Sequence, residues 1–430
     1  MSKVLVVGSG GREHALAWAL QRSVGVDEVH VAPGNGGTAS LATNVAISAD
    51  DVDGLAAYAE SERFDLTVVG PEVPLSLGVA DAFVARGLRV FGPSAQAARI
   101  ESSKAFSKDF MRAHGIPTAD YGLFDDYDQA VSYVEAQSVP IVVKASGLAA
   151  GKGAFVCRSD QEALAALDII MKERAFGPAG DIVVIEAFVM GQEVSVLAFC
   201  DGETIAPMIL SQDHKPVFDG DRGPNTGGMG CYAPASVLGP DLLARVQDEV
   251  LQATVDGMAA AGTPYVGVLY AGLMVSDDEF SVLEFNCRFG DPETQAILPL
   301  LHTDLHAVLD ACIEGDLDQI ELTWDDAHCV CVVMASEGYP GAYDKGHRIE
   351  GLGEVADRDD TMVFHAGTRR KGDHVYTDGG RVLGVTSWAP TLENAVTRAY
   401  SAVDEIAWPG AFCRRDIGAK GLVAAKGDRR

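Results

Sequence analysis

The chain has 430 residues, of which 47% are hydrophobic and 22% charged, a composition typical of soluble globular proteins. Because one domain usually contains roughly 150 residues, this length suggests about three domains. The net charge of −29 argues against a general nucleic-acid or anionic-membrane surface, although a small basic pocket could still bind an anionic substrate.

The cysteines follow no pairing pattern, and Cys329 and Cys331 are too close in sequence for the CxxC spacing of redox or zinc sites. Reduced, buried thiols in a cytoplasmic protein are therefore expected. The chain begins with a strand at residues 4–7, which leaves no room for a signal peptide. No apolar run approaches the roughly 20 residues that a membrane span needs. We expect neither a membrane nor a nucleic-acid partner.

Short apolar strands alternate with periodic helices over residues 1–92. This alternation is typical of βαβ units and predicts a Rossmann-like parallel sheet, in an N-terminal domain of residues 1–103. Pro93 breaks the rhythm, and an amphipathic helix that begins at Lys104 is expected to follow.

Residues 104–326 are predicted to form a second domain from two α+β units. The smaller unit, about residues 120–190, contains two β-branched strands around a glycine-rich loop, then a helix and another strand. Longer strands and a helix from Pro240 to about residue 261 predict an antiparallel sheet in the larger unit. Residues 327–430 indicate a small α+β domain at the C-terminal end.

The loop GLAAGKGA at residues 147–154 is not a P-loop. Only three residues separate Gly147 from Gly151, and Gly153 stands where that motif needs Ser or Thr. The flanking segments resemble strands, so this loop is predicted to be the tip of a hairpin.

A second glycine cluster, at residues 8–12, follows the first strand and opens a helix. The dinucleotide-binding fingerprint would need glycine at position 13, where Glu13 stands. Backbone N–H groups and Arg12 could bind an anion at this helix start, although a tight turn without a ligand is the alternative. Clusters at residues 34–36 and 71–72 follow later strands and should lie along the same carboxyl edge of the sheet.

Lysines and an acidic strand end surround the smaller unit. A nucleotide held between two domains could place its phosphates on Lys104 and Lys144 and its adenine edge against backbone groups of residues 187–189. Glu193 would suit the ribose hydroxyls. Each position alone is weak evidence, because lysines and glutamates are common on protein surfaces.

The strongest cluster is LEFNCRFGDPETQ at residues 283–295. In a strand, Glu284 and Asn286 point to the same face, and their oxygen atoms suit Mg²⁺ bound to phosphates. Arg288 would add a cation on that face if the strand continues so far. A solvated strand edge is the alternative, but three alternating polar side chains are costly to bury without a ligand or mutual pairing.

A long polar loop spans residues 211–230, and such loops in compact domains are usually functional or disordered. Asp213 could hold a substrate ammonium group, and the backbone of residues 225–228 could approach a small ligand closely. His214 is more simply explained as a structural histidine than as a general base.

Taken together, these motifs resemble the ATP-grasp superfamily. Over essentially the whole chain, the sequence is similar to the phosphoribosylamine–glycine ligase family in VVGSGGREHAL, APGNGG, KASGLAAGKGA, SQDHK, GPNTGGMG, RFGDPETQ, FHAGT, GGRVLGVT and FCRRDIG. The resemblance implies that ATP phosphorylates glycine to glycyl phosphate. The amine of 5-phosphoribosylamine then attacks, giving glycinamide ribonucleotide, ADP and phosphate in purine biosynthesis. ATP as co-substrate, Mg²⁺ or Mn²⁺, and a monomer or weak homodimer are expected.

The resemblance also implies roles for individual residues. Lys144, Arg288 and Asp213 are expected to be catalytic, and Glu284 and Asn286 to bind the metal. The expected ATP-binding residues are Lys104, Lys144, Gly147, Gly151, Lys152, Gly153, Glu186, Ala187, Phe188, Val189 and Glu193. The expected substrate-binding residues are Gly8, Gly10, Gly11, Arg12, Glu13, Gly34, Asn35, Gly36, Pro71, Glu72, Asp213, Asn225, Thr226, Gly227, Gly228, Arg288, Gly290 and Asp291. The glycine hairpin is expected to be a mobile lid that closes over the β- and γ-phosphates.

Two departures from the family pattern stand out. Pro216 replaces the basic residue that usually follows the lysine of SQDHK, and the strand at residues 267–274 carries no carboxylate. Glu284 and Asn286 are therefore the only expected protein ligands of the metal. Two alternative functions remain. One is another ATP-grasp carboxylate–amine or biotin-dependent ligase; the other is a non-catalytic nucleotide-binding or dinucleotide-binding module, against which Glu13 counts.

Overall fold

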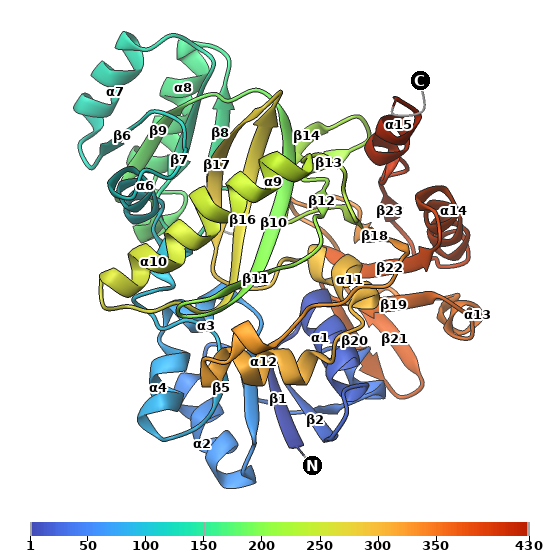
Figure 1. Cartoon of the computed structure of the whole chain (residues 1–430). Helices are drawn as coiled ribbons and strands as arrows, with labels where there is room; N and C mark the ends of the chain where they lie inside the picture. The colour runs from blue at the N-terminus through green and yellow to red at the C-terminus, as the bar shows by residue number, and fades with distance from the viewer. Residues whose placement is uncertain (1, 150, 428–430) are drawn as a thin grey trace.

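The computed structural model describes residues 2–149 and 151–427. Its N-terminal part is a five-stranded parallel sheet in the order β3-β2-β1-β4-β5, at the bottom of Figure 1. The strands are β1 (Ser2–Gly8), β2 (Val26–Pro33), β3 (Thr43–Asn44), β4 (Leu66–Val69) and β5 (Val90–Phe91). The helices are α1 (Gly11–Gln21), α2 (Val52–Glu62), α3 (Glu72–Ser76) and α4 (Val79–Ala85), with the 3-10 turn η1 (Thr38–Ser40). The predicted Rossmann-like sheet is confirmed.

The central strand β1 is buried on both faces, as its apolar sequence VLVV requires. It pairs with β2 on one side and β4 on the other, so the turns after these three strands meet at one edge of the sheet. This is the carboxyl edge at which the sequence predicted a binding site.

Two short helices, α5 (Arg99–Ser102) and α6 (Lys104–Ala113), lead to the unit that we call the lid unit, residues 121–187. Its antiparallel sheet has the order β6-β9-β7-β8. The strands are β6 (Tyr121–Phe124), β7 (Ile141–Ala145), β8 (Ala154–Cys157) and β9 (Val183–Ala187). The helices are α7 (Tyr127–Ala136) and α8 (Asp160–Leu167), followed by η2 (Asp168–Lys172) and η3 (Gly177–Gly180). The lid unit has a hydrophobic core of its own.

Strands β7 and β8 pair antiparallel, so the glycine loop between them is a hairpin tip, as predicted. Ala150 of this loop lies outside the described residues.

The central sheet is antiparallel, in the order β11-β10-β16-β17. Its strands are β10 (Gln192–Asp201), β11 (Ile205–Pro207), β16 (Val266–Ser276) and β17 (Glu279–Asn286). One continuous helical stretch packs its apolar side against this sheet and is made of α9 (Pro240–Val246), η4 (Gln247–Gln252) and α10 (Ala253–Ala260). After β17 follow α11 (Glu293–Ile297), η5 (Leu298–Leu300), α12 (Leu305–Glu314) and η6 (Leu317–Gln319).

The C-terminal strands continue a sheet that begins in the middle of the chain. The order is β12-β15-β18-β22-β19, with β23 also paired to β18. The strands are β12 (Gln212–Asp213), β15 (Gly230–Ala233), β18 (His328–Ser336), β19 (Thr361–His365), β22 (Arg381–Ala389) and β23 (Ala411–Cys413). This sheet crosses the predicted domain boundary at residue 327, so the C-terminal residues are joined to the second domain through backbone hydrogen bonds.

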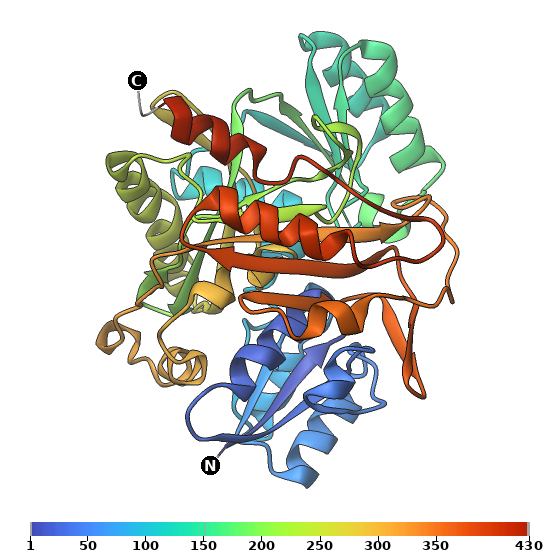
Figure 2. The ribbon, with the colours of Figure 1, turned by 90° about the vertical axis from the view of Figure 1, so that its right-hand side faces the viewer.

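Helix α14 (Leu392–Val403) covers one face of this sheet, as Figure 2 shows. The remaining elements are the hairpins β13 (Pro216–Phe218) with β14 (Arg222–Asn225) and β20 (Thr368–Lys371) with β21 (His374–Thr377), and the helices α13 (Leu352–Ala356) and α15 (Ala419–Gly427).

All eight cysteines belong to the described residues and are free thiols; seven are buried, as expected, whereas Cys413 is half-buried. Within the described part of the chain, no helix is long and apolar enough to cross a membrane.

Candidate active site

A cavity of about 910 Å³ lies between the carboxyl edge of the N-terminal sheet, the lid unit and the central sheet. Residues from the C-terminal part of the chain, among them Tyr339 and Arg381, complete its wall. Four segments that are far apart in sequence therefore contribute to one site.

Most of the expected site residues line this cavity. From the ATP-binding group these are Lys104, Lys144, Gly151, Lys152, Gly153, Glu186, Ala187, Phe188, Val189 and Glu193. From the substrate-binding and metal-binding groups they are Gly8, Gly10, Arg12, Glu13, Pro71, Glu72, Asp213, Asn225, Thr226, Gly227, Glu284, Asn286, Arg288 and Asp291.

Seven expected residues are not part of the lining: Gly11, Gly34, Asn35, Gly36, Gly147, Gly228 and Gly290. At each of the six glycines, a Cβ atom would stand 3.0 Å or less from another atom, so these positions allow close packing. A Cβ atom at Gly11 would stand only 2.5 Å from Nε2 of Gln295. The Asn35 amide donates a hydrogen bond of 2.7 Å to the carbonyl of His365 and thereby ties the N-terminal sheet to the C-terminal strands.

The N-terminal glycine turn is already occupied by carboxylates of the protein. The N–H of Gly10 donates to Glu13 at 2.5 Å, and the N–H of Arg12 donates to Asp291 at 3.2 Å. Glu13 also pairs with the Arg12 guanidinium. A Cβ atom at Gly70 would lie 2.0 Å from the Glu13 carboxylate, so that glycine is needed to accommodate the acid. Glu13 thus fills the place of the third glycine in a dinucleotide-binding turn.

Of the two expected phosphate-binding lysines, Lys104 begins α6 and Lys144 lies in β7 of the lid unit. Lys144 forms an ion pair with one carboxylate oxygen of Glu186, and Lys108 lies 2.6 Å from the other. Burial lowers the pKa of Lys104 and of Lys108. Burial would also lower the pKa of Lys144, but Glu186 and Glu284 outweigh it and raise that pKa, so Lys144 keeps its charge.

Lys108 was not predicted as a site residue. It follows Lys104 by four positions on α6, so the two side chains emerge on the same helix face. This spacing of four residues could therefore have identified Lys108 from the sequence.

The acidic strand end forms a compact polar group. Strand β17 stops at Asn286, so the strand does not continue to Arg288 as the same-face argument required. The Arg288 guanidinium nevertheless reaches Asn286, donating to its Oδ1 at 3.1 Å. It also lies 3.0 Å from Glu101 and 3.4 Å from Glu72. Burial would lower the pKa of Arg288, but these two carboxylates outweigh it and raise that pKa.

Glu284 differs from the other acids around the cavity. The described residues make no hydrogen bond or ion pair to its carboxylate within 4.0 Å, yet burial does not protonate it. Burial would raise its pKa, but Lys215, Lys144 and Lys104 outweigh burial and lower that pKa. An ionised carboxylate without a partner, beside the Asn286 oxygen, is a donor set suited to a hard cation. Among the described residues, no group of three or more His, Cys, Asp or Glu side chains could hold a metal ion.

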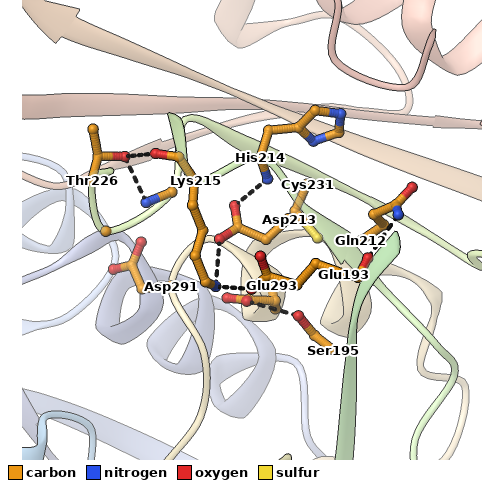
Figure 3. Close-up of polar contacts among 12 residues, drawn as sticks. Glu193, Ser195, Gln212, Asp213, His214, Lys215, Thr226, Cys231, Asp291 and Glu293 are labelled. Carbon is orange, nitrogen blue, oxygen red and sulfur yellow. Dashed lines mark hydrogen bonds and ion pairs between the residues drawn. The ribbon is translucent and has the colours of Figure 1, made fainter. Parts of the chain in front are cut away.

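A second polar group surrounds Lys215 (Figure 3). Its Nζ lies 3.2 Å from Asp213 and 3.2 Å from Glu193. The neighbouring carboxylate of Glu293 accepts a hydrogen bond of 2.6 Å from the hydroxyl of Tyr270. Burial raises the pKa of Asp213 to about 7; Lys215 opposes this shift, and Glu293 and Glu193 add to it. Asp213 therefore titrates close to neutral pH.

His214 does not line the cavity. Its ring is buried against the carbonyl of Gly230, at 3.2 Å from Nδ1, and burial lowers its pKa to about 4. This agrees with the structural role that the sequence favoured.

Sequence reasoning missed these polar residues of the lining besides Lys108: Ser9, Ser48, Asp50, Glu101, Ser107, Lys215, Tyr270, Glu293, Tyr339, Tyr343 and Arg381. Among them, Lys215 belongs to the motif SQDHK quoted above, Glu293 to RFGDPETQ and Arg381 to GGRVLGVT. The sequence did not show that their side chains face the cavity. Nothing in the local sequence distinguishes Glu101 or Tyr270 from surface or core residues.

Family models cover nearly all of the chain. Residues 2–101, 102–294 and 329–420 match, respectively, the N domain, the ATP-grasp (A) domain and the C domain of phosphoribosylglycinamide synthetase. The chain belongs to the phosphoribosylglycinamide synthetase family. The resemblance seen in the sequence is therefore confirmed.

Curated relatives match over nearly the full length of the chain, and two of them illustrate this. The phosphoribosylamine–glycine ligase of Allochromatium vinosum is 52% identical over 424 residues, which cover 98% of this chain and 99% of the relative. That of Vibrio cholerae is 51% identical over 424 residues, with the same coverage.

Solved structures agree with this assignment. The crystal structure of phosphoribosylamine–glycine ligase from Thermotoga maritima superimposes with a TM-score of 0.84 at 32% identity, covering 96% of this chain and 99% of that one. The biotin carboxylase domain of the Hydrogenobacter thermophilus 2-oxoglutarate carboxylase, solved with MgADP, has a TM-score of 0.72 at 17% identity, covering 96% and 92%. At that identity the likeness concerns the fold alone.

Proposed function

We propose that the protein joins glycine to 5-phosphoribosylamine in the cavity described above, through a glycyl phosphate formed with ATP. Membership of the family makes the protein an ATP-dependent phosphoribosylamine–glycine ligase of purine biosynthesis. The residue roles are the proposal. The observation that carries them is the convergence of the lysines, the Glu284 group, the Asp213 group and the N-terminal turn on one cavity.

A carboxylate is a poor electrophile, so glycine must be activated before an amine can attack it. A glycine oxygen attacks the γ-phosphorus of ATP, and the bond to the ADP oxygen breaks. The amine of phosphoribosylamine then attacks the carbonyl carbon, a C–N bond forms, the C–O bond to phosphate breaks, and the amine loses a proton. Transfer of this kind depends on positioning and charge neutralisation more than on covalent help from the protein.

Lys104, Lys144 and Arg288 would neutralise the phosphate charge. Lys144 can turn from Glu186 toward a phosphate because Lys108 remains on the other oxygen of that acid. Backbone groups of residues 187–189 would contact the adenine edge, and Glu193 the ribose.

The donor atoms of Glu284 and Asn286 fit Mg²⁺ or Mn²⁺, because both are hard oxygen ligands and Glu284 is ionised without a protein partner. Glu284 and Asn286 would hold the divalent ion, which would supply positive charge to offset the negative charge of the phosphates during transfer.

Asp213 would hold the ammonium group of glycine, with the backbone of residues 225–227 beside it. The glycine hairpin would close over the phosphates; Leu148, Ala149, Lys152 and Gly153 of this loop line the cavity. Closure excludes water, which would otherwise hydrolyse the acyl phosphate. The cytoplasmic location and the monomer or weak homodimer stay predictions from the sequence.

A coupled ADP assay with each substrate omitted in turn tests this proposal. ADP formation should depend on glycine, phosphoribosylamine and Mg²⁺. Glu284→Ala and Lys144→Ala should each lose about 100-fold or more of the activity with the fold intact. Lys172→Ala is the matched control in the lid unit, since that lysine pairs with Asp168 on the surface. Equal ADP formation without glycine would refute the assignment, and faster turnover with bicarbonate would favour the alternative ligase.

A further inference from the structure

Arg381 belongs to the C-terminal part of the chain, at the start of β22, but its guanidinium reaches the cavity. Its Nη1 donates to the carbonyls of Gly227 at 2.6 Å, Asp291 at 2.7 Å and Gly228 at 3.3 Å. Its Nη2 lies 3.3 Å from the Asp291 carboxylate. Four acceptors, three of them backbone carbonyls, therefore depend on one side chain.

Asp291 carries this connection on to the N-terminal sheet. One oxygen of its carboxylate faces Arg381, while the other accepts the N–H of Arg12 at 3.2 Å. Burial would raise the pKa of Asp291, but Arg381 and Arg12 outweigh it and lower that pKa, so the connecting group is a charged carboxylate. The N-terminal turn, the start of α11 and strand β22 thus meet at Asp291.

The loop at residues 225–228 is fixed from the same side. The hydroxyl of Tyr339 accepts the N–H of Gly227 at 3.3 Å. Gly228 has a φ of +109°, and a Cβ atom there would lie 2.6 Å from Oδ1 of Asp213. The loop is packed against Asp213, so a displacement of the loop would move the wall of the proposed glycine site.

We propose that Arg381 is a positioning residue for the ligase reaction. Through Asp291, Arg381 holds the loop at residues 225–228 in a fixed position relative to the N-terminal turn. The inference rests on the proposed function, in which Asp213 holds the ammonium group of glycine. It adds that the amine substrate approaches from the N-terminal turn, whose Gly8, Gly10 and Arg12 line the same cavity. When the loop is not held in this position relative to the turn, water replaces the amine as the attacking group. The C–O bond of glycyl phosphate then breaks to return glycine and phosphate, and ADP forms without the amide.

The decisive quantity is the number of ADP molecules released per glycinamide ribonucleotide formed. In the wild-type protein this ratio should be close to one. In Arg381→Ala and in Arg381→Lys, which keeps the charge but lacks the planar fork, we expect kcat for the amide product to fall about tenfold or more. The ADP ratio should rise well above one, while KM for ATP stays within about twofold.

Arg398→Ala is the matched control. Arg398 also donates to one carboxylate, Asp360 at 2.7 Å, and to one carbonyl of β22, Trp388 at 3.0 Å, but it lies outside the cavity. It should keep the wild-type ratio. Arg381→Lys keeps the test valid if Arg381→Ala does not fold.

Two outcomes would overturn the inference: a ratio of one with wild-type kinetic constants in both Arg381 variants, or a parallel loss of every constant and of thermal stability at an unchanged ratio. The wild-type omission assay separates this from a failure of the proposed function, because it tests glycine dependence without any substitution.

Discussion

Glu186 shares its carboxylate between Lys108 and Lys144, and all three side chains are almost fully buried. Leaving a buried charge unpaired destabilises a protein by about 3–5 kcal/mol. With two lysines on one acid, Lys144 can move to a phosphate while Lys108 keeps the acid paired. This arrangement explains, at the scale of single residues, how a lysine buried in the protein stays available to a ligand.

Asp213 leads to a prediction about pH. Its pKa of about 7 means that the carboxyl group is protonated below neutral pH, and a protonated group does not attract the ammonium of glycine. KM for glycine should therefore rise about tenfold between pH 8 and pH 6, following the protonated fraction. Steady-state kinetics at each pH, with saturating ATP, measure KM for glycine. Asp213→Asn should bind glycine weakly at both pH values, and a flat wild-type KM across this range would contradict the role of Asp213.

Secondary structure could be predicted where the signal is local. The hairpin around Gly151 and the helix that begins at Lys104 depend on neighbouring residues, so both were found from the sequence. The end of β17 could not be found from the sequence, because Cys287 and Arg288 continue the alternating pattern although the strand pairing stops at Asn286. The lining residue Tyr270 was missed for a similar reason, since only the fold decides which face of a buried strand meets a cavity.

Gly228 allows a test of the loop that carries the site. Because of its positive φ and the short distance to Asp213, Gly228→Ala should lower the free energy of unfolding by about 1–3 kcal/mol and reduce kcat. Gly353→Ala, in exposed helix α13 with no atom near the added Cβ, should be neutral or slightly stabilising. Chemical denaturation and the ADP assay give both values; equal behaviour of the two variants would show that the loop tolerates a side chain.

Closure of the glycine hairpin over ATP predicts that the nucleotide protects the hairpin from trypsin. Lys152 is exposed at the hairpin tip and offers trypsin a cleavage site. If the hairpin closes over phosphates, MgATP should slow cleavage after Lys152 about tenfold or more, since cleavage follows the population of the open form. Cleavage after Lys420, which is exposed far along the chain, should keep its rate. Mass spectrometry of the fragments distinguishes the sites, and cleavage after Lys152 at the same rate with MgATP would argue against a lid.

At the scale of the whole molecule, the parallel sheet and the lid unit were predictable because each is built from consecutive elements. The sheet shared by the second domain and the C-terminal residues, in the order β12-β15-β18-β22-β19, was not predictable. Strands β12 and β15 have only two and four residues, and β15 pairs with β18, whose first residue lies about 100 positions later. The consequence is a continuous hydrophobic cluster that includes Leu5 of β1, Val196 of β10 and Val332 of β18, while the lid unit keeps its own.

This division of the core predicts how the molecule opens. Amides of β1 and β18 should exchange hydrogen with the same free energy of opening, because both strands belong to the shared cluster, and amides of β7 and β9 should exchange at a lower free energy. Val332→Ala, at a fully buried position, should lower the value for β1 and β18 alike by about 2 kcal/mol and leave β7 unchanged. Val423→Ala, at an exposed position, is the control. Independent, faster exchange of β18 would mean that the C-terminal strands unfold separately and that the shared sheet does not couple them to the site.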